Sequence, residues 1–309
     1  MNKYICNLKY IIKKSLLGYP IGVVSCLILY DSNKLIVSSG NDKHIRIWNL
    51  NTGRVLKVLK GHSDGVNCLR LLANGLGQLA SGSYDETIRI WPLSAILTSS
   101  NSNQNSTLLT SKIRGGSISC LEYMSSSGNL LSAGGDFMRQ IIQVWDLNKR
   151  SCVRLMEDPS SFITCLKDLN NNENSDLFAN GSYDRTVKIW NASNGMCLKV
   201  LEGHSGIVYD IQFVTHQSKR LLVSCSGDKT IRVWDLANLN APNKELECVH
   251  VLEGHEKDVR CVRVNPNTDE LISGSEDRTL KIWDLNEAVC LRNIQTDFSI
   301  NGFVLCTDV

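Results

Sequence analysis

The chain has 309 residues, and 33 lysines and arginines against 31 aspartates and glutamates leave a net charge of +2 at pH 7. This balance argues against a general binder of nucleic-acid backbones, which carries a basic excess. Apolar residues make up 42% of the chain and charged residues 21%, a globular composition that excludes wholesale disorder.

The N-terminal region only superficially resembles a signal peptide. An uncharged run at 16–30 follows several lysines, but Pro20 and Gly22 interrupt it and no small-residue cleavage site follows. The run is also shorter than the roughly 20 apolar residues of a membrane span. The 12 cysteines include no Cys-x-x-Cys pair. We therefore expect no membrane insertion and a reducing compartment, the cytoplasm, with the nucleus as the alternative.

The tryptophans mark six repeats in chain order, ending near Trp48, Trp91, Trp145, Trp190, Trp234 and Trp283. Five repeats end in nearly the same sequence, in which an aspartate precedes the tryptophan by six residues: SSGNDKHIRIWN, SGSYDETIRIWP, NGSYDRTVKIWN, SCSGDKTIRVWD and SGSEDRTLKIWD. Polar residues around the aspartate predict a turn. The apolar alternation with period 2 that follows predicts a strand.

Two more strands are expected before each turn and one after each tryptophan. The first carries a cysteine, as in VSCLIL (24–29), VNCLRL (66–71), ISCLEY (118–123), ITCLKD (163–168) and VRCVRV (259–264). The strand after the tryptophan ends in three repeats at a Gly-His pair, in RVLKVLKGH (54–62), MCLKVLEGH (196–204) and CVHVLEGH (248–255). Four strands per repeat leave no room for helices.

The third repeat departs from the pattern. Residues 137–140 lengthen its hairpin turn, and a flexible surface insertion is expected at 93–114, where the polar run SSNSNQNST (99–107) lies.

These repeats resemble the WD-repeat family, with its Gly-His and Trp-Asp landmarks. The resemblance implies an all-β fold, a β-propeller of four-stranded antiparallel blades, over 1–309 as a single domain. Six complete repeats are followed by a partial seventh at 289–309, with one outer strand (289–294) and one inner strand (303–309); a further outer strand is expected at about 8–17. We favour a fragment of a seven-bladed protein, because an open sheet edge promotes aggregation. Six closed blades with an extra tail are the alternative.

Three repeats place histidine, serine, aspartate and tryptophan in the same register: His62, Ser81, Asp85 and Trp91; His204, Ser224, Asp228 and Trp234; His255, Ser273, Asp277 and Trp283. Serine, histidine and aspartate also form catalytic triads, but an enzyme needs one such site, whereas this set occurs three times. No Gly-x-Ser-x-Gly motif accompanies it. In the resembled family they form a structural hydrogen-bonded chain inside a blade. Tyr19 stands where the first repeat would carry the histidine, and Asn180 where the fourth would carry the serine, so these two blades are expected to be less rigid.

No catalytic residue, metal site or cofactor site is predicted. The recurrent cysteines are interpreted as small fillers between blades, because equivalent positions in different blades lie too far apart to share an ion. No phosphate-binding glycine loop is present.

The resemblance also implies a binding surface on the top face, formed by the residues three and five after the Gly-His histidine and by the residue before the turn aspartate. In the fourth repeat, which lacks the Gly-His pair, the positions are assigned by aligning the strand cysteine. The candidates are Asn67, Tyr84, Phe162, Tyr183, Ile207, Tyr209, Asp258, Arg260 and Glu276. Aromatic residues of this kind are enriched at interface hot spots.

The sequence therefore predicts a non-catalytic scaffold or adaptor that binds a protein or peptide on the propeller top face, within a multiprotein complex and without direct nucleic-acid binding. The alternative is a substrate-recognition subunit of a ubiquitin ligase. Against it, the phosphate-reading form of such subunits has several top-face arginines, whereas only Arg260 qualifies here.

Overall fold

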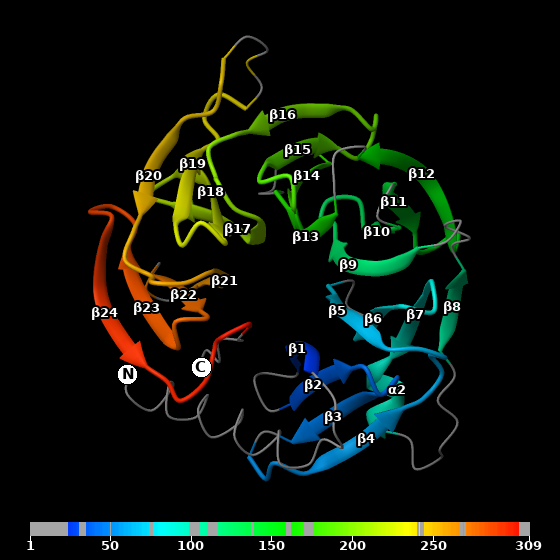
Figure 1. Ribbon diagram of the computed structural model, residues 1–309. Coiled ribbons are helices and arrows are strands. Elements are labelled where there is room, and N and C mark those ends of the chain that lie inside the picture. Colours follow the sequence, from blue (N-terminus) through cyan, green and yellow to red (C-terminus); the bar gives the residue numbers. More distant parts are fainter. Residues whose placement is uncertain are drawn as a thin grey trace. The chain divides into compact units, whose positions relative to one another are not determined.

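The computed structural model describes residues 24–30, 35–49, 51–73, 77–98, 106–110, 116–136, 139–158, 162–169, 176–239, 241, 244–265, 268 and 270–302. These residues form six four-stranded antiparallel sheets (Figure 1). The chain divides into two units, the first ending at Tyr123 and the second running from Met124 to Gly302.

The first unit contains two complete sheets whose strands follow each other in chain order. Sheet 1 consists of β1 (Val24–Tyr30), β2 (Leu35–Gly40), β3 (Ile45–Asn49) and β4 (Val55–Leu59). Sheet 2 consists of β5 (Val66–Leu72), β6 (Gln78–Ser83), β7 (Thr87–Pro92) and β8 (Thr107–Thr110). Strand β9 (Ser117–Tyr123) follows and is the first strand of sheet 3.

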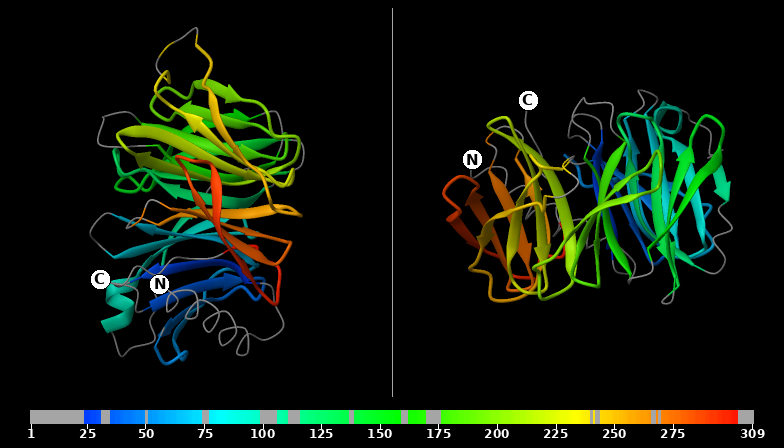
Figure 2. Two further views of the ribbon diagram at one scale, coloured as in Figure 1. Left: turned by 90° about the vertical axis from the view of Figure 1, so that its left-hand side faces the viewer. Right: turned by 90° about the horizontal axis from the view of Figure 1, so that it is seen from above.

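The second unit contains the other three strands of sheet 3, which are β10 (Leu130–Gly135), β11 (Gln140–Asp146) and β12 (Ser151–Asp158). Sheet 4 has β13 (Ile163–Asp168), β14 (Leu177–Ser182), β15 (Val187–Asn191) and β16 (Cys197–Leu201). Sheet 5 has β17 (Val208–His216), β18 (Lys219–Ser226), β19 (Ile231–Asp235) and β20 (Cys248–Leu252). Sheet 6 has β21 (Val259–Val264), β22 (Leu271–Ser275), β23 (Thr279–Asp284) and β24 (Val289–Gln295). The strands of these sheets are visibly twisted (Figure 2).

Burial follows strand position within a sheet. The second strand is buried at every residue in sheet 4, whose sequence LFANGS contains only apolar and small polar residues. The outer strand β24 is exposed at most positions and carries Val289 and Leu291 in contact with solvent. The burial pattern explains why apolar residues are concentrated in the inner strands and alternate with polar ones farther out.

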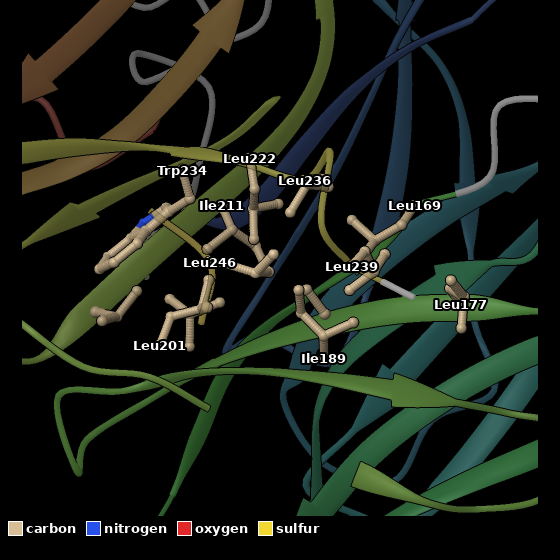
Figure 3. Packing of buried hydrophobic residues seen from close by; sticks show 13 residues of the cluster. Leu169, Leu177, Ile189, Leu201, Ile211, Leu222, Trp234, Leu236, Leu239 and Leu246 are labelled. Atoms are coloured by element: carbon tan, nitrogen blue, oxygen red, sulfur yellow. The ribbon is translucent and has the colours of Figure 1, made fainter. Parts of the chain in front are cut away.

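Apolar side chains fill the space between sheets 4 and 5. Leu177 and Ile189 from sheet 4 join Ile211, Leu222 and Trp234 from sheet 5 in one buried cluster (Figure 3). Each fully buried side chain of this size contributes about 1.5–3 kcal/mol relative to an exposed one. The contact between successive sheets, rather than any single sheet, is therefore where the core lies within this unit.

The five-times repeated turn places one residue in the left-handed region. The residue after the turn aspartate has a positive φ in each copy, at Lys43, Glu86, Arg185, Lys229 and Arg278, with values from 64° to 74°. The aspartate holds this turn, because Asp85 Oδ1 accepts hydrogen bonds from Thr87 N at 3.0 Å and Thr87 Oγ1 at 2.6 Å. The same two bonds recur at Asp184, Asp228 and Asp277.

Two expectations from sequence are wrong. A helix is present, α2 (Leu93–Thr98), and the segment 93–114 is not wholly an irregular insertion, since it also contains β8, the fourth strand of sheet 2. The reason is apolar contact: Leu93 and Ile96 are buried against the cluster formed by sheets 1 and 2. Leu109 of β8 is likewise buried.

The expected strands at about 8–17 and 303–309 lie outside the described residues. Strand β24 occupies the expected outer-strand position at 289–294. In the described part of the chain, no helix has the length and apolar character needed to cross a bilayer.

Candidate functional site

In sheets 2, 5 and 6 the recurring histidine, serine, aspartate and tryptophan side chains lie within hydrogen-bond distance of one another. In sheet 2, Trp91 Nε1 donates to Ser81 Oγ at 2.8 Å, and Ser81 Oγ lies 2.7 Å from His62 Nε2. His62 Nδ1 lies 2.8 Å from Asp85 Oδ2. The corresponding distances in sheets 5 and 6 are between 2.7 and 2.9 Å.

The direction of each bond follows from the groups involved. An indole N–H can only donate and a carboxylate can only accept. The histidine Nδ1–H therefore donates to the aspartate, and the serine hydroxyl accepts from the tryptophan and donates to Nε2. Burial lowers the pKa of His62 and of His255 below 6.5, and the bonds to Asp85 and Asp277 oppose this only in part. His62 and His255 are therefore neutral at pH 7, as the bond pattern requires.

These serines are inaccessible to a substrate. Ser81, Ser224 and Ser273 have 0% exposure, and each accepts the tryptophan N–H. A serine nucleophile needs an open path to a carbonyl carbon. The arrangement stabilises the sheet and offers no reaction site.

The turn aspartates remain charged at neutral pH. Burial raises the pKa of Asp277, but hydrogen bonds from Thr279, His255 and Glu256 N outweigh that effect and bring it to about 2. The same balance lowers the pKa of Asp85 and of Asp228.

Sheet 4 builds its polar chain without a histidine. Trp190 Nε1 donates to Asn180 Oδ1 at 2.6 Å, and Asn180 Nδ2 lies 3.5 Å from Asp158 Oδ2. Lys188 Nζ then donates to Asp158 Oδ1 at 2.7 Å and to the turn residue Asp184 at 3.0 Å. Lys188 therefore connects the turn residue Asp184 to the other hydrogen-bonded side chains of sheet 4, as the histidine does in sheets 2, 5 and 6. The missing serine and histidine, which suggested a less rigid blade, are thus replaced by Asn180, Asp158 and Lys188.

Sheets 1 and 3 show two further variants. In sheet 1, Trp48 Nε1 donates to Ser38 Oγ at 2.8 Å, and Arg46 pairs with the turn residue Asp42 at 2.5 Å. In sheet 3, Trp145 Nε1 donates to Ser132 Oγ at 2.9 Å, which lies 3.3 Å from Gln143 Oε1. Arg46, Gln143 and Lys188 all stand two residues before the tryptophan. In sheets 1 and 4 the residue at this position contacts the turn aspartate, and in sheet 3 it lies beside the serine that accepts the tryptophan N–H.

A backbone bond joins the candidate top-face residues in pairs. The N–H of the residue before the turn aspartate donates to the carbonyl of the residue three after the histidine position: Tyr84 to Gly65, Tyr183 to Phe162, Gly227 to Ile207 and Glu276 to Asp258, at 2.9–3.0 Å. Residues that are about 20 apart in sequence are therefore adjacent in the structure.

Six of the candidates in the second unit form what we call the aromatic–ionic surface: Phe162, Tyr183, Tyr209, Asp258, Arg260 and Glu276. Phe162 and Tyr183 meet edge to face with ring centroids 5.4 Å apart. The Arg260 guanidinium carbon lies 3.9 Å from the centroid of the Tyr209 ring, and the Tyr209 hydroxyl donates to Asp258 Oδ2 at 3.0 Å. Burial and the bond to Asp258 raise the pKa of Tyr209 to about 12.

Arg260 also has two carboxylate neighbours. Its Nε and Nη2 donate to Glu276 Oε1 at 2.9 and 2.5 Å, and its Nη2 lies 3.5 Å from Asp258 Oδ2. The side chains remain between 29% and 35% exposed, so a partner can reach them. Tyr183 is 48% exposed.

The other candidates are placed differently. Tyr84 is 53% exposed in the first unit, where a Cβ on Gly65 would lie 3.2 Å from its ring. Asn67 uses its amide within the protein, since Nδ2 donates to Ile118 O at 3.0 Å. Ile207, in the second unit, contributes its carbonyl to the bond with Gly227 and is partly buried.

The cysteines occupy structural positions. Cys152, Cys197, Cys248 and Cys290 each pair across the sheet with a tryptophan, at a register shift, and direct Sγ toward the carbonyl two residues on. Burial raises the pKa of Cys152 and of Cys197, which lowers the thiolate fraction. Within the described residues, no group of three or more potential ligands could hold a metal ion.

Sequence reasoning missed an ion pair beside these strands. Asp210 stands where other repeats carry the inner-strand cysteine, and it pairs with Arg263 of the neighbouring β21. Cys225 stands where sheets 2, 4 and 6 have a glycine, facing Asp210. The exchange of the Cys–Gly pair for an Asp–Cys pair was visible in the aligned repeats and was the signal that could have identified this pair.

Comparison with known proteins agrees with this arrangement. The family model for "WD domain, G-beta repeat" matches residues 13–49, 53–92, 150–191, 195–235 and 246–284, more than half of the chain. The chain belongs to the WD-repeat family. The six sheets are blades of a β-propeller fold, and the repeat between 92 and 150 that the family model omits is the one whose sequence departs most.

Three fungal proteins are among the relatives of this chain. The nuclear distribution protein nudF of Aspergillus niger is 38% identical over 253 residues, covering 75% of this chain and 52% of the relative. PAC1-1 of Uncinocarpus reesii, also a nuclear distribution protein, is 26% identical and covers 84% of this chain and 68% of the relative. Cell division control protein 4 of Saccharomyces cerevisiae is 26% identical, covering 91% of this chain. The chain spans 38% to 68% of the length of these three relatives.

Proposed function

We propose that this WD-repeat chain is a non-catalytic scaffold that binds a protein or peptide through the aromatic–ionic surface. The observation that carries the proposal is the grouping of Tyr183, Tyr209 and Arg260 at the ends of three adjacent sheets, all three partly exposed. Arg260 lies over the ring of Tyr209, and Tyr183 packs against Phe162. Tyrosine and arginine are the residues most often found at the energetic centre of interfaces. WD-repeat proteins are in general interaction scaffolds, which supports the same conclusion.

The recurring Ser-His-Asp sets support the absence of catalysis in this proposal. Their serines are buried and saturated with hydrogen bonds, and the arrangement occurs once in each of three sheets. Membership of a multiprotein complex, without direct contact to nucleic acid, remains part of the proposal. A single propeller domain over 1–309 and a cytoplasmic location, with the nucleus as the alternative, remain predictions.

The alternative role in a ubiquitin ligase has less support. A subunit that reads phosphorylated substrates needs uncommitted arginines, whereas Arg260 already contacts Glu276, Asp258 and the ring of Tyr209. Recovery of cullin components with the chain would nevertheless favour it.

Affinity capture from cells, with mass spectrometry, tests the proposal. The variant Tyr183→Ala/Tyr209→Ala/Arg260→Ala, with Tyr84→Ala added in a second version, should lose specific partners while retaining the circular dichroism spectrum of the unmodified chain. The matched control is Leu155→Ala, since Leu155 of β12 is 62% exposed and lies outside the surface. Undiminished capture by both surface variants would exclude this surface as the binding site.

A further inference from the structure

We infer that the partner presents a lysine or arginine side chain to the aromatic–ionic surface, flanked by an apolar or aromatic residue. The inference rests on the proposed function and specifies the chemistry of the bound segment.

The ionic part of the surface carries a net negative charge. Arg260 is the one cation of this surface and lies between two carboxylates, Asp258 and Glu276. The three groups together carry a charge of −1. Burial and hydrogen bonding keep the neighbouring Tyr209 hydroxyl neutral, so it adds no charge at pH 7. Charge complementarity across an interface then favours a cationic group on the partner.

Arg260 is already engaged by other residues of the surface. Two of its nitrogens bond to Glu276, and its guanidinium plane is held over the ring of Tyr209. A phosphate or carboxylate on a partner would have to displace Glu276 and would face both carboxylates at close range. Arg260 could suggest an anion-binding site from the sequence. In the structure it instead holds the carboxylates of Glu276 and Asp258 in position.

Two carboxylate oxygens of the surface are available as hydrogen-bond acceptors. Among the described residues, Glu276 Oε2 and Asp258 Oδ1 take no hydrogen bond, and their side chains are 35% and 31% exposed. A carboxylate has about four lone-pair sites. These oxygens can accept from an ammonium or a guanidinium group without breaking an existing contact.

A glycine lies beside these acceptors. Gly227 occupies the position that Tyr84 and Tyr183 occupy in other repeats, and a Cβ there would lie 3.3 Å from both Asp258 Oδ2 and Tyr209 Cε2. Because residue 227 has no side chain, the sides of Tyr209 and Asp258 that face it are not covered from that position. Tyr183, 48% exposed and braced by Phe162, supplies an adjacent aromatic surface for the flanking residue or for a cation–π contact.

A peptide selection tests the inference with the full chain. The probe is a bead library of decapeptides, acetylated and amidated, with seven degenerate positions that include phosphoserine. The unmodified chain should enrich lysine and arginine over aspartate, glutamate and phosphoserine, with an aromatic or aliphatic residue next to the cation. Asp258→Asn and Glu276→Gln should each weaken the selected peptides by about two- to five-fold, the range for exposed charge pairs. Glu287→Gln, an exposed glutamate elsewhere in sheet 6, is the matched control and should change nothing.

The outcomes separate the two proposals. The double variant Asp258→Asn/Glu276→Gln changes the local charge from −1 to +1 and should reverse the preference toward acidic or phosphorylated peptides. Tyr183-dependent binding with enrichment of acidic residues, or with no charge preference, would overturn this inference and leave the proposed function standing. Peptide binding that is unaffected by Tyr183→Ala, or no binding at all, would overturn both.

Discussion

Replacement of Lys188 by methionine is the sharpest test of the polar chain in sheet 4. Lys188 is 8% exposed, and its Nζ bonds to Asp158 at 2.7 Å and to Asp184 at 3.0 Å. The two bonds raise the pKa of Lys188 despite its burial, so the native state holds a charged lysine. Methionine keeps the length of the side chain but leaves Asp158, 1% exposed, without its cation. Removal of one partner from a buried ion pair costs about 3–5 kcal/mol.

Urea unfolding followed by tryptophan fluorescence, together with hydrogen exchange of β13–β16, measures this loss. The matched control is Lys281→Met: Lys281 has the same position in sheet 6 and is 9% exposed, but there His255 holds the turn aspartate. We expect a cost of about 1 kcal/mol for the control, and partial recovery when Asp158→Asn is added to Lys188→Met. Equal losses for the two lysine variants would refute the idea that Lys188 replaces a histidine.

Three other predictions concern stability. His204→Ala should lower the free energy of unfolding by about 1–3 kcal/mol, since it removes two buried hydrogen bonds, and the urea midpoint should fall more than for His250→Ala on the outer strand of the same sheet. Because His62 and His255 have a lower pKa in the folded chain than in the unfolded chain, the unfolded chain binds more protons below pH 6.5. Urea unfolding at pH 7.5, 6.5 and 5.5 should therefore show a free energy of unfolding that decreases as the pH is lowered. An increase toward pH 5.5 would contradict the neutral assignment. Gly274→Ala should cost about 1–3 kcal/mol in thermal unfolding, because its Cβ would lie 2.3 Å from Ile300 Cγ2, whereas Gly302→Ala meets nothing within 4 Å and should be neutral.

Repetition made most of the fold predictable. The six tryptophans stand at equivalent positions of six repeats, so the strands before them could be predicted by aligning the repeats with one another. Helix α2 was missed because it has only six residues, too few for a helical period to be recognised, and because it follows directly on a strand. Its one signal was the spacing of Leu93 and Ile96, three residues apart, after Pro92.

The binding candidates were less predictable than the fold. Sequence alignment could assign Asp258, Arg260 and Glu276 to one corner, but it could not show which charges neutralise each other, since that depends on side-chain distances. For the same reason the role of Lys188 was hidden: its partner Asp158 lies 30 residues earlier and outside the repeated motif. The partner of Lys188 could therefore not be read from the aligned repeats, whereas the exchange at Asp210 and Cys225 was visible in them.

Site-specific photocrosslinking most directly tests whether the aromatic–ionic surface binds a partner. A photoreactive phenylalanine analogue in place of Tyr183 keeps an aromatic ring at a position that is 48% exposed. The same analogue in place of Leu155 probes a position on β12 that is 62% exposed. On illumination in cells, the account predicts discrete protein adducts from position 183, which disappear with Arg260→Ala/Glu276→Gln, and none from position 155. Adducts from position 155 alone, or adducts from 183 that persist in the double variant, would contradict it.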